Sequence, residues 1–200
     1  VSNDPYDGGS HLPDITVMQP VFDRGRRIAW VACRGHHIDV GGTQPGSMPP
    51  FSTHIGEEGV VLRPQLLSHG RRFIPPQLGD CREPGQVLAD LRAQVAACAW
   101  GATGVGDLAG VDSSARMVAG FSALLAAGRH AAQRVLALRT GVHVGSEVFD
   151  DGTVLSVQLE IADGRAMLSL DAPRHAGNLN APPAVARAAI TQLASSVAVI

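Results

Sequence analysis

The sequence contains no lysine: its 16 basic residues are all arginines, against 18 acidic residues in a chain of 200. Without an ε-amino group the chain cannot supply a P-loop lysine, form a Schiff base or anchor pyridoxal phosphate. If ATP takes part in the reaction, we expect another chain to bind it. The net charge of −2, without basic runs, gives no electrostatic footprint for nucleic acid, so we expect no nucleic-acid partner.

Cysteine is also scarce, with three residues at Cys33, Cys81 and Cys98. Their odd number and wide spacing argue against a disulfide framework or a zinc ribbon and favour a reducing compartment. No apolar run approaches the roughly 18 residues that a membrane-spanning helix needs. We therefore expect a cytoplasmic protein with no membrane partner.

The hydrophobic fraction of 45% is high enough for a folded core. Two runs rich in β-branched and aromatic residues, Ile15–Phe22 and Arg27–Cys33, flank a turn sequence at 23–26 and predict an antiparallel hairpin. Pro20 should lie at a sheet edge or a bulge, because proline cannot donate a ladder hydrogen bond.

Helical spacing of apolar residues predicts helices over 84–100 and 113–140, separated by the glycine-rich segment 101–110. A second hairpin is predicted from Thr153–Ile161 and Arg165–Leu170, which flank Asp163-Gly164. The segment 181–200 should form a C-terminal helix, with its two prolines in the first turn.

These elements predict an α+β fold in which antiparallel β-hairpins carry the site and helices pack on one side. We divide it into a β-rich metal-site region over 1–80, a helical region over 81–145, and a β-hairpin plus C-terminal helix over 146–200. We expect the three regions to be parts of one larger domain that is truncated at both ends.

The candidate chemistry lies at the open end of the first hairpin. If its turn centres between residues 24 and 25, Asp14 lies opposite Gly35 and His36 opposite Pro13, so that His11, Asp14 and His36 meet. Opposed residues have Cβ atoms about 4.5–5.5 Å apart, which is close enough to share one ion. A slip of one residue would replace His36 by His37.

Two imidazoles and one carboxylate with an open coordination position suit Zn²⁺, Mn²⁺ or Fe²⁺. Such an ion lowers the pKa of bound water and polarises a carbonyl group, which is hydrolytic chemistry. The alternative is that these residues only cap turns, since Asp and His are common at strand ends.

Further candidates lie close by. We assign catalytic roles to Asp4, His37 and Asp39, although Asp4 could instead accept a hydrogen bond in an Asx turn. A group at 53–59 that contains His54 and Glu57 could form a solvated polar face, or it could supply a general base or another metal ligand.

Several strings resemble the hydantoinase B/oxoprolinase family, in the family's order. They are NDPYDGGSHLPDITV at 3–17, PVF at 20–22, RGHHIDVGG at 34–42, PGSMPP at 45–50, EEGV at 57–60, DLRAQVAA at 90–97 and GNLNAPPAVARAA at 177–189. The Ala-rich region 99–148 departs from the pattern.

The resemblance implies the B-type subunit or domain of an ATP-dependent cyclic-amide hydrolase, with a divalent-metal site at His11, Asp14 and His36. It also implies a further acidic ligand from a segment before Asn3, and a hetero-oligomer with an A-type ATPase subunit or domain. That partner would activate a lactam or hydantoin ring for opening by metal-activated water. Two alternatives stay open: a subunit of a related ATP-dependent ketone carboxylase, and an inactive truncated remnant.

Overall fold

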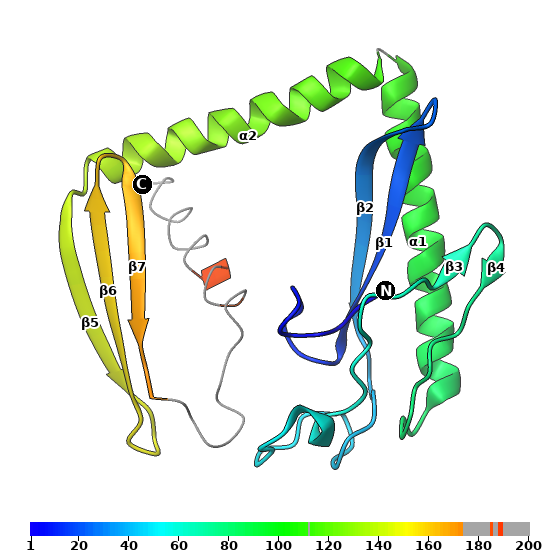
Figure 1. The fold of residues 1–200 in the computed structure, drawn as a ribbon, viewed down its shortest axis with the longest axis horizontal. Helices are drawn as coiled ribbons and strands as arrows, with labels where there is room; N and C mark the ends of the chain where they lie inside the picture. Colours follow the sequence, from blue (N-terminus) through cyan, green and yellow to red (C-terminus); the bar gives the residue numbers. More distant parts are fainter. Residues whose placement is uncertain (112, 174–184, 186–187, 190–200) are drawn as a thin grey trace. The chain divides into compact units, whose positions relative to one another are not determined.

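The computed structural model describes residues 1–111, 113–173, 185, 188 and 189 (Figure 1). Apart from these last three residues, the helix predicted over 181–200 lies outside the described residues. The chain divides into two compact units, one built mainly from Val1–Ala119 and the other beginning at Gly120. The boundaries at residues 80 and 145 stay predictions. In the described part, no helix is both long and apolar enough to cross a membrane.

The first unit is organised around an antiparallel hairpin of β1 (Asp14–Asp23) and β2 (Arg26–His36), which confirms the sequence-based prediction. The turn places Arg24 and Gly25 at φ angles of 47° and 80°. Two consecutive residues in the left-handed region are typical of the type I′ turn, whose twist matches that of paired strands. Glycine suits the second position because it has no Cβ to clash there.

The register of this hairpin differs from the predicted one by a single residue. Near the turn Phe22 pairs with Arg27, but the next pair is Val21 with Ala29, which leaves Ile28 unpaired as a β-bulge. The bulge lies close to Pro20, where the sequence predicted an edge or a bulge.

The bulge corrects the predicted pairing at the open end of the hairpin. Asp14 lies directly opposite His36, and not opposite Gly35 as the uninterrupted register required. Because side chains alternate between the two faces of a strand, this register puts Asp14 and His36 on the same face.

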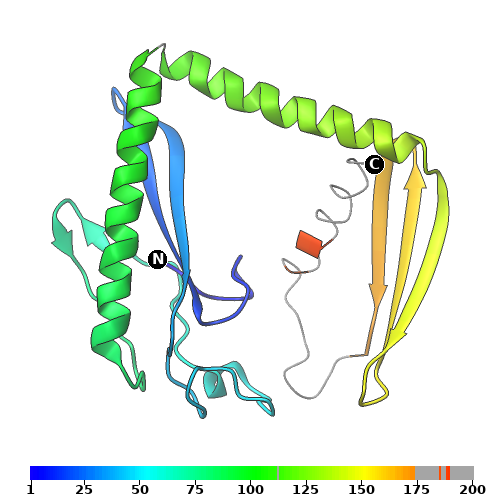
Figure 2. The same cartoon turned by 180° about the vertical axis from the view of Figure 1, so that it is seen from behind.

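The helix α1 (Pro84–Val111) covers the other face of the hairpin, as the view from behind shows (Figure 2). It runs through the segment that we predicted to separate two helices, so that prediction was wrong. Gly101 explains part of the difference, since a Cβ there would lie 2.8 Å from Cγ1 of Val31 on β2. Glycine allows the helix to approach the strand, and this packing outweighs the low helix propensity of glycine.

The core of the first unit forms between α1, the α1-facing side of the hairpin and the loops that follow β2. Its buried side chains are Leu12, Ile15, Val17, Val40, Leu62, Leu67, Leu78, Cys81, Val87, Leu91 and Cys98. The 3₁₀ helix η1 (Ile55–Glu57) and the short pair β3 (Ser68–His69) and β4 (Arg72–Phe73) interrupt these loops.

Most of the helix α2 (Ser114–Ala137) belongs to the second unit, which also contains an antiparallel sheet in the order β5 (Gly141–Val148), β6 (Val154–Ala162) and β7 (Arg165–Asp171). The β6–β7 hairpin was predicted, whereas β5 was missed. Helices and antiparallel strands together confirm the α+β fold class.

Candidate metal centre

Three side chains converge at the open end of the β1–β2 hairpin. His11, Asp14 and His36 each offer one ligand atom, and these atoms all lie within 4.8 Å of one another. The two imidazole ring centroids are 5.0 Å apart, and Nε2 of His11 lies 3.4 Å from Oδ2 of Asp14. Elsewhere in the described ranges, no other three His, Cys, Asp or Glu side chains form such a group.

Local structure accounts for this convergence. His11 and Asp14 are joined by a tight turn in which the Asp14 amide donates to the His11 carbonyl oxygen at 3.1 Å. β1 begins at Asp14 and β2 ends at His36, its direct partner. The next residue, Ile15, is fully buried in the core beneath α1. Alternation therefore directs Asp14 and His36 away from α1.

Two polar residues that the sequence analysis did not assign support the turn. Ser10 donates its hydroxyl to Oδ2 of Asp14 at 2.5 Å. The buried side chain of Asn3 donates to the carbonyl oxygens of Leu12 and Val60 at 2.8 and 3.0 Å and accepts from the Leu62 amide at 2.6 Å. The N-D-P-Y and H-L-P-D strings are thus joined through a side-chain amide, which was not visible from spacing in the sequence.

His37, a predicted catalytic residue, lies outside the cluster. Its side chain is 2% exposed, its Nε2 lies 3.1 Å from Oε1 of Gln94 on α1, and its backbone amide donates to the Pro13 carbonyl. The β-strand alternation that exposes His36 buries His37, so the structure brings only His36 toward His11 and Asp14.

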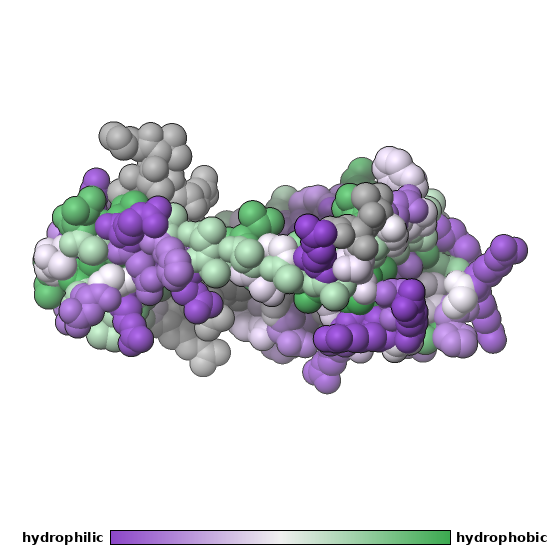
Figure 3. All heavy atoms as spheres, turned by 90° about the horizontal axis from the view of Figure 1, so that it is seen from above, coloured by the Kyte–Doolittle hydropathy of each residue, from purple (hydrophilic) through white to green (hydrophobic). Residues whose placement is uncertain are grey.

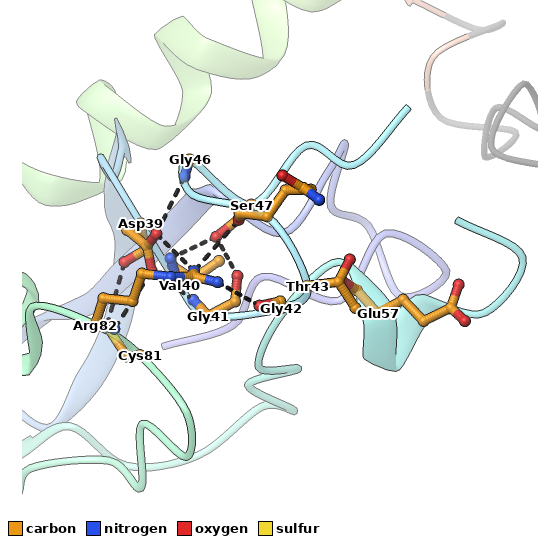
Figure 4. A network of polar contacts seen from close by, with 11 residues as sticks. Asp39, Val40, Gly41, Gly42, Thr43, Gly46, Ser47, Glu57, Cys81 and Arg82 are labelled. Atoms are coloured by element: carbon orange, nitrogen blue, oxygen red, sulfur yellow. Dashed lines mark hydrogen bonds and ion pairs between the residues drawn. The ribbon is translucent and has the colours of Figure 1, made fainter. Parts of the chain in front are cut away.

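Asp39, the second predicted catalytic residue, organises the glycine-rich loop after β2 (Figure 4). Its carboxylate accepts from the amides of Gly41 and Gly46 at 2.9 and 3.1 Å and from Nη1 of Arg82 at 2.9 Å. Burial acts to raise the pKa of the Asp39 carboxyl, but these hydrogen bonds outweigh it and hold the pKa below its ordinary value. The Asp39 carboxylate therefore holds the loop in place, and both of its oxygens already accept hydrogen bonds.

The same loop is closed by two further contacts. Arg82 donates through Nη2 to the Gly42 carbonyl at 2.7 Å, and the Ser47 hydroxyl bridges the Val40 amide and the Gly41 carbonyl at 2.8 and 2.7 Å (Figure 4). A Cβ on Gly42 would lie 2.5 Å from the Glu57 carbonyl oxygen, so the two loop segments touch through backbone.

Asp4, the third predicted catalytic residue, adopts the alternative that the sequence left open. Its Oδ1 accepts from the Tyr6 amide at 3.0 Å, which is an Asx turn. The carboxylate is not among the groups that converge with His11.

The group at 53–59 is likewise engaged in local structure. His54 caps η1 by accepting from the Gly56 amide through Nδ1, and Glu57 accepts from the Thr53 and His54 amides. These two bonds account for a pKa of Glu57 below its ordinary value. This reciprocal arrangement is a capping box, in which backbone donors are satisfied.

The buried cysteines are unsuited to ligation or nucleophilic attack. Burial raises the pKa of the thiols of Cys81 and Cys98, and the Cys81 thiol contacts the Asp39 carbonyl oxygen at 3.3 Å. Because the thiolate is the reactive form, both groups stay protonated packing residues.

The donor set of the His11–Asp14–His36 cluster fits a divalent transition metal. Imidazole nitrogens and a carboxylate oxygen suit Zn²⁺, Mn²⁺ and Fe²⁺, and His11 and Asp14 are only half-buried while His36 is exposed. The cluster therefore leaves room for water or a substrate beside the three protein ligands. A hairpin with this open cluster and a helix behind it defines a candidate metal-binding domain.

The chain belongs to the Hydantoinase B/oxoprolinase family, which it matches over residues 1–199. This confirms the sequence-based resemblance. It is 34% identical to 5-oxoprolinase 1 of Arabidopsis thaliana over 226 aligned residues, which cover 95% of this chain and 18% of that protein. The chain therefore spans only a small part of the length of this relative.

Solved structures show the same fold. The crystal structure of an ATP-dependent caprolactamase from Pseudomonas jessenii matches with a TM-score of 0.68 and 26% identity, covering 86% of this chain and 32% of that one. A nucleotide-free acetone carboxylase matches with a TM-score of 0.74 over 86% of this chain and 26% of that one. At 20% identity, the likeness to acetone carboxylase shows the fold alone.

Proposed function

We propose that this chain forms the metal-binding part of the hydrolytic subunit or domain of an ATP-dependent cyclic-amide hydrolase of the 5-oxoprolinase or hydantoinase type. The observation that carries the proposal is the convergence of His11, Asp14 and His36 within 4.8 Å on the open face of the hairpin. Family membership and the similarity to 5-oxoprolinase 1 and caprolactamase support a cyclic amide as the substrate.

The three cluster residues would hold Zn²⁺, Mn²⁺ or Fe²⁺. Such an ion supplies a water of lowered pKa and polarises a carbonyl oxygen. The chain itself contributes the ligands and their orientation: Ser10 fixes the Asp14 carboxylate, and the paired strands keep His36 opposite it. α1 packs on the far face of the hairpin, and His36 is exposed on the face that carries the cluster, so a ring can approach from that face.

An amide carbonyl in a lactam or hydantoin is a poor electrophile because resonance stabilises it. A partner ATPase of the A type would transfer the γ-phosphoryl group of ATP to that carbonyl oxygen. Water would then add to the carbon and the C–N bond would break with a proton passing to nitrogen, which leaves an acyl phosphate. A second water would hydrolyse this acyl phosphate to the carboxylate and inorganic phosphate. For 5-oxoproline, the product would be glutamate. The absence of lysine from this chain suits a division of labour in which the partner binds ATP.

We extend the proposal to a hetero-oligomer in the cytoplasm. The ketone-carboxylase alternative makes a different prediction, because it consumes bicarbonate in place of water. Isotope tracing with ¹⁸O-labelled water and ¹⁴C-labelled bicarbonate, in the protein combined with its A-type partner, separates the two. Label from water in the ring-opened product supports hydrolysis, whereas fixed ¹⁴C contradicts it.

The metal proposal is tested by His11→Ala and His36→Ala. After mild chelation and reloading with Mn²⁺ or Zn²⁺, we expect the unaltered protein to retain about one ion and each variant to lose it, with little change in circular dichroism. His69→Ala and His130→Ala serve as matched controls and should retain the ion. Equal metal content in all five proteins, or none in any, contradicts the proposal; the second result is the one expected of an inactive remnant.

A further inference from the structure

Gln94 is a polar exception in the apolar stripe that α1 presents to the hairpin. Val87, Leu91 and Cys98 lie on that helix face, one and then two helical turns apart, and all three are buried hydrophobic core residues. Gln94 is only 7% exposed. Burying an amide without hydrogen bonds costs about 1–3 kcal/mol, so its contacts need an explanation.

The amide of Gln94 is fully engaged, and its contacts fix its orientation. Nε2 donates to the carbonyl oxygen of Ile15 at 2.9 Å and to that of Cys33 at 3.3 Å. Carbonyl oxygens accept only from the NH₂ group, so Oε1 must be the atom that faces Nε2 of His37 at 3.1 Å. Since Oε1 can only accept, His37 donates through Nε2.

This network makes Nε2 of His37 a proton donor. The other ring nitrogen, Nδ1, is buried and has no hydrogen-bond partner among the described residues. His37 is therefore held by one side-chain hydrogen bond, to Gln94, and its backbone amide bond to Pro13 ties it to β1.

The positions of these bonds connect them to the candidate metal centre. Ile15 follows Asp14 on β1, and His37 follows His36 at the end of β2. The side chain of Gln94 thus bonds to Ile15 on β1 and to His37 directly after β2. Each of these residues is next to a cluster member in the sequence. Gly35 permits this approach, because a Cβ there would lie 3.2 Å from Nε2 of Gln94.

We propose that Gln94 is a positioning residue that fixes the separation of Asp14 and His36 for metal binding. The inference rests on the proposed function, since it assumes that the cluster binds an ion. A two-stranded ribbon is only marginally stable by itself, and its open end is where the strands separate most easily. The buried amide ties that end to a 28-residue helix, so the two ligands keep their spacing before an ion arrives.

The test is Gln94→Met, which keeps the length of the side chain and removes its polar atoms. We expect the Kd for Mn²⁺, measured by titration calorimetry, to rise about 10-fold, the lower end of the range for residues that support metal ligands indirectly. Gln86→Met is the matched control, since Gln86 lies on the same helix but is exposed, and its side-chain amide donates to Oδ1 of Asp90 at 3.0 Å. Its Kd should be unchanged.

A second control separates positioning from general stability. Cys98→Ala removes a buried side chain one turn further along α1, whose thiol contacts the Val17 carbonyl oxygen at 3.5 Å. We expect it to lower Tm without changing the Kd for Mn²⁺. If Gln94→Met leaves the Kd unchanged, or if Cys98→Ala raises it equally for the same loss in Tm, the positioning role is wrong.

A readout without metal distinguishes this inference from the metal proposal. In ¹⁵N NMR of the metal-free protein, Nε2 of His37 should be protonated, and Gln94→Met should leave the proton distributed between the two ring nitrogens. A His37 ring that is unprotonated on Nε2 overturns the network itself. If Nε2 of His37 is protonated as expected but the unaltered protein does not bind Mn²⁺, the network is correct. The metal proposal and the positioning role are then rejected.

Discussion

The two units of the chain use the same turn in hairpins that differ in how they are covered. The β1–β2 turn at Arg24-Gly25 and the β6–β7 turn at Asp163-Gly164 both place consecutive residues at positive φ. The first hairpin buries Ile15, Val17 and Val21 on one face. In the second sheet, Ile161 is the one buried hydrophobic residue among those described. α2 has no described residue that is buried, and apolar side chains are visible along it in Figure 3.

The difference indicates what a site on a hairpin requires. The same turn chemistry connects the strands of both hairpins, but a register is strongly specified only where one face is buried. α1 supplies that burial for β1 and β2, and the cluster lies on the face left open. In the described part of the second unit, the sheet carries no comparable group of ligands.

The largest expected contrast between the units concerns stability. Leu91→Ala, at a fully buried position on α1, should lower the free energy of unfolding by about 2–5 kcal/mol. Leu124→Ala on α2 should change it by less than about 0.5 kcal/mol, because Leu124 is 72% exposed. Urea denaturation measures both.

Tryptophan fluorescence suits the Leu91 variant, since both tryptophans, Trp30 and Trp100, lie in the first unit. Circular dichroism reports both units for the Leu124 variant. Equal losses of unfolding free energy in Leu91→Ala and Leu124→Ala would contradict the predicted difference in burial.

Alanine substitutions at two glycines, one in each unit, should change the stability in opposite directions. Gly42→Ala should destabilise the first unit by about 2 kcal/mol, because φ is 85° and the new Cβ meets backbone at 2.5 Å. Gly120→Ala in α2 meets nothing within 4 Å and should stabilise the helix by up to about 1 kcal/mol. Thermal unfolding of both variants checks this; a neutral Gly42→Ala would show that the loops separate easily.

A further predicted effect depends on pH. The folded-state pKa of Asp39 is lowered, so its carboxylate stabilises the fold above the unfolded-state pKa of about 3.9. That contribution is lost as the pH falls through the folded value. Asp39→Asn should cost about 1–3 kcal/mol at pH 6 and less at pH 3, measured by urea denaturation.

Glu147→Gln is the control for this prediction in the second unit. Its side chain lies on β5, where every residue is exposed. We expect a change below about 0.5 kcal/mol at either pH. An Asp39→Asn variant that loses the same stability at pH 3 and pH 6 would argue against a lowered pKa.

The sequence predicted most of what local chemistry determines. Turn residues located both hairpins, and the spacing of His11, Asp14 and His36 located the cluster. It failed where tertiary packing decides: the bulge at Ile28 shifts the register, and contact with Val31 allows helix α1 to continue through Gly101. β5 was missed although Val142, Val144 and Val148 carry a partly alternating β-branched pattern that could have indicated it.

Gln94 could not have been assigned from the sequence. It stood inside the resembling string DLRAQVAA, but its role follows only from the carbonyl groups and the imidazole that the fold brings to it. Likewise, the assignments of Asp4, His37 and Asp39 as catalytic rested on residue type and proximity in sequence. Their hydrogen bonds show that these side chains stabilise the local fold, and their catalytic roles stay predictions.

We infer that the bulged register selects His36, together with His11 and Asp14, as the ligands of one ion. Electron spin-echo envelope modulation of the Mn²⁺-loaded protein counts the imidazole nitrogens bound to the metal. We expect two in the unaltered protein, one in His36→Ala and two in His37→Asn. No bound imidazole in the unaltered protein, or the loss of one in His37→Asn with none lost in His36→Ala, would contradict it.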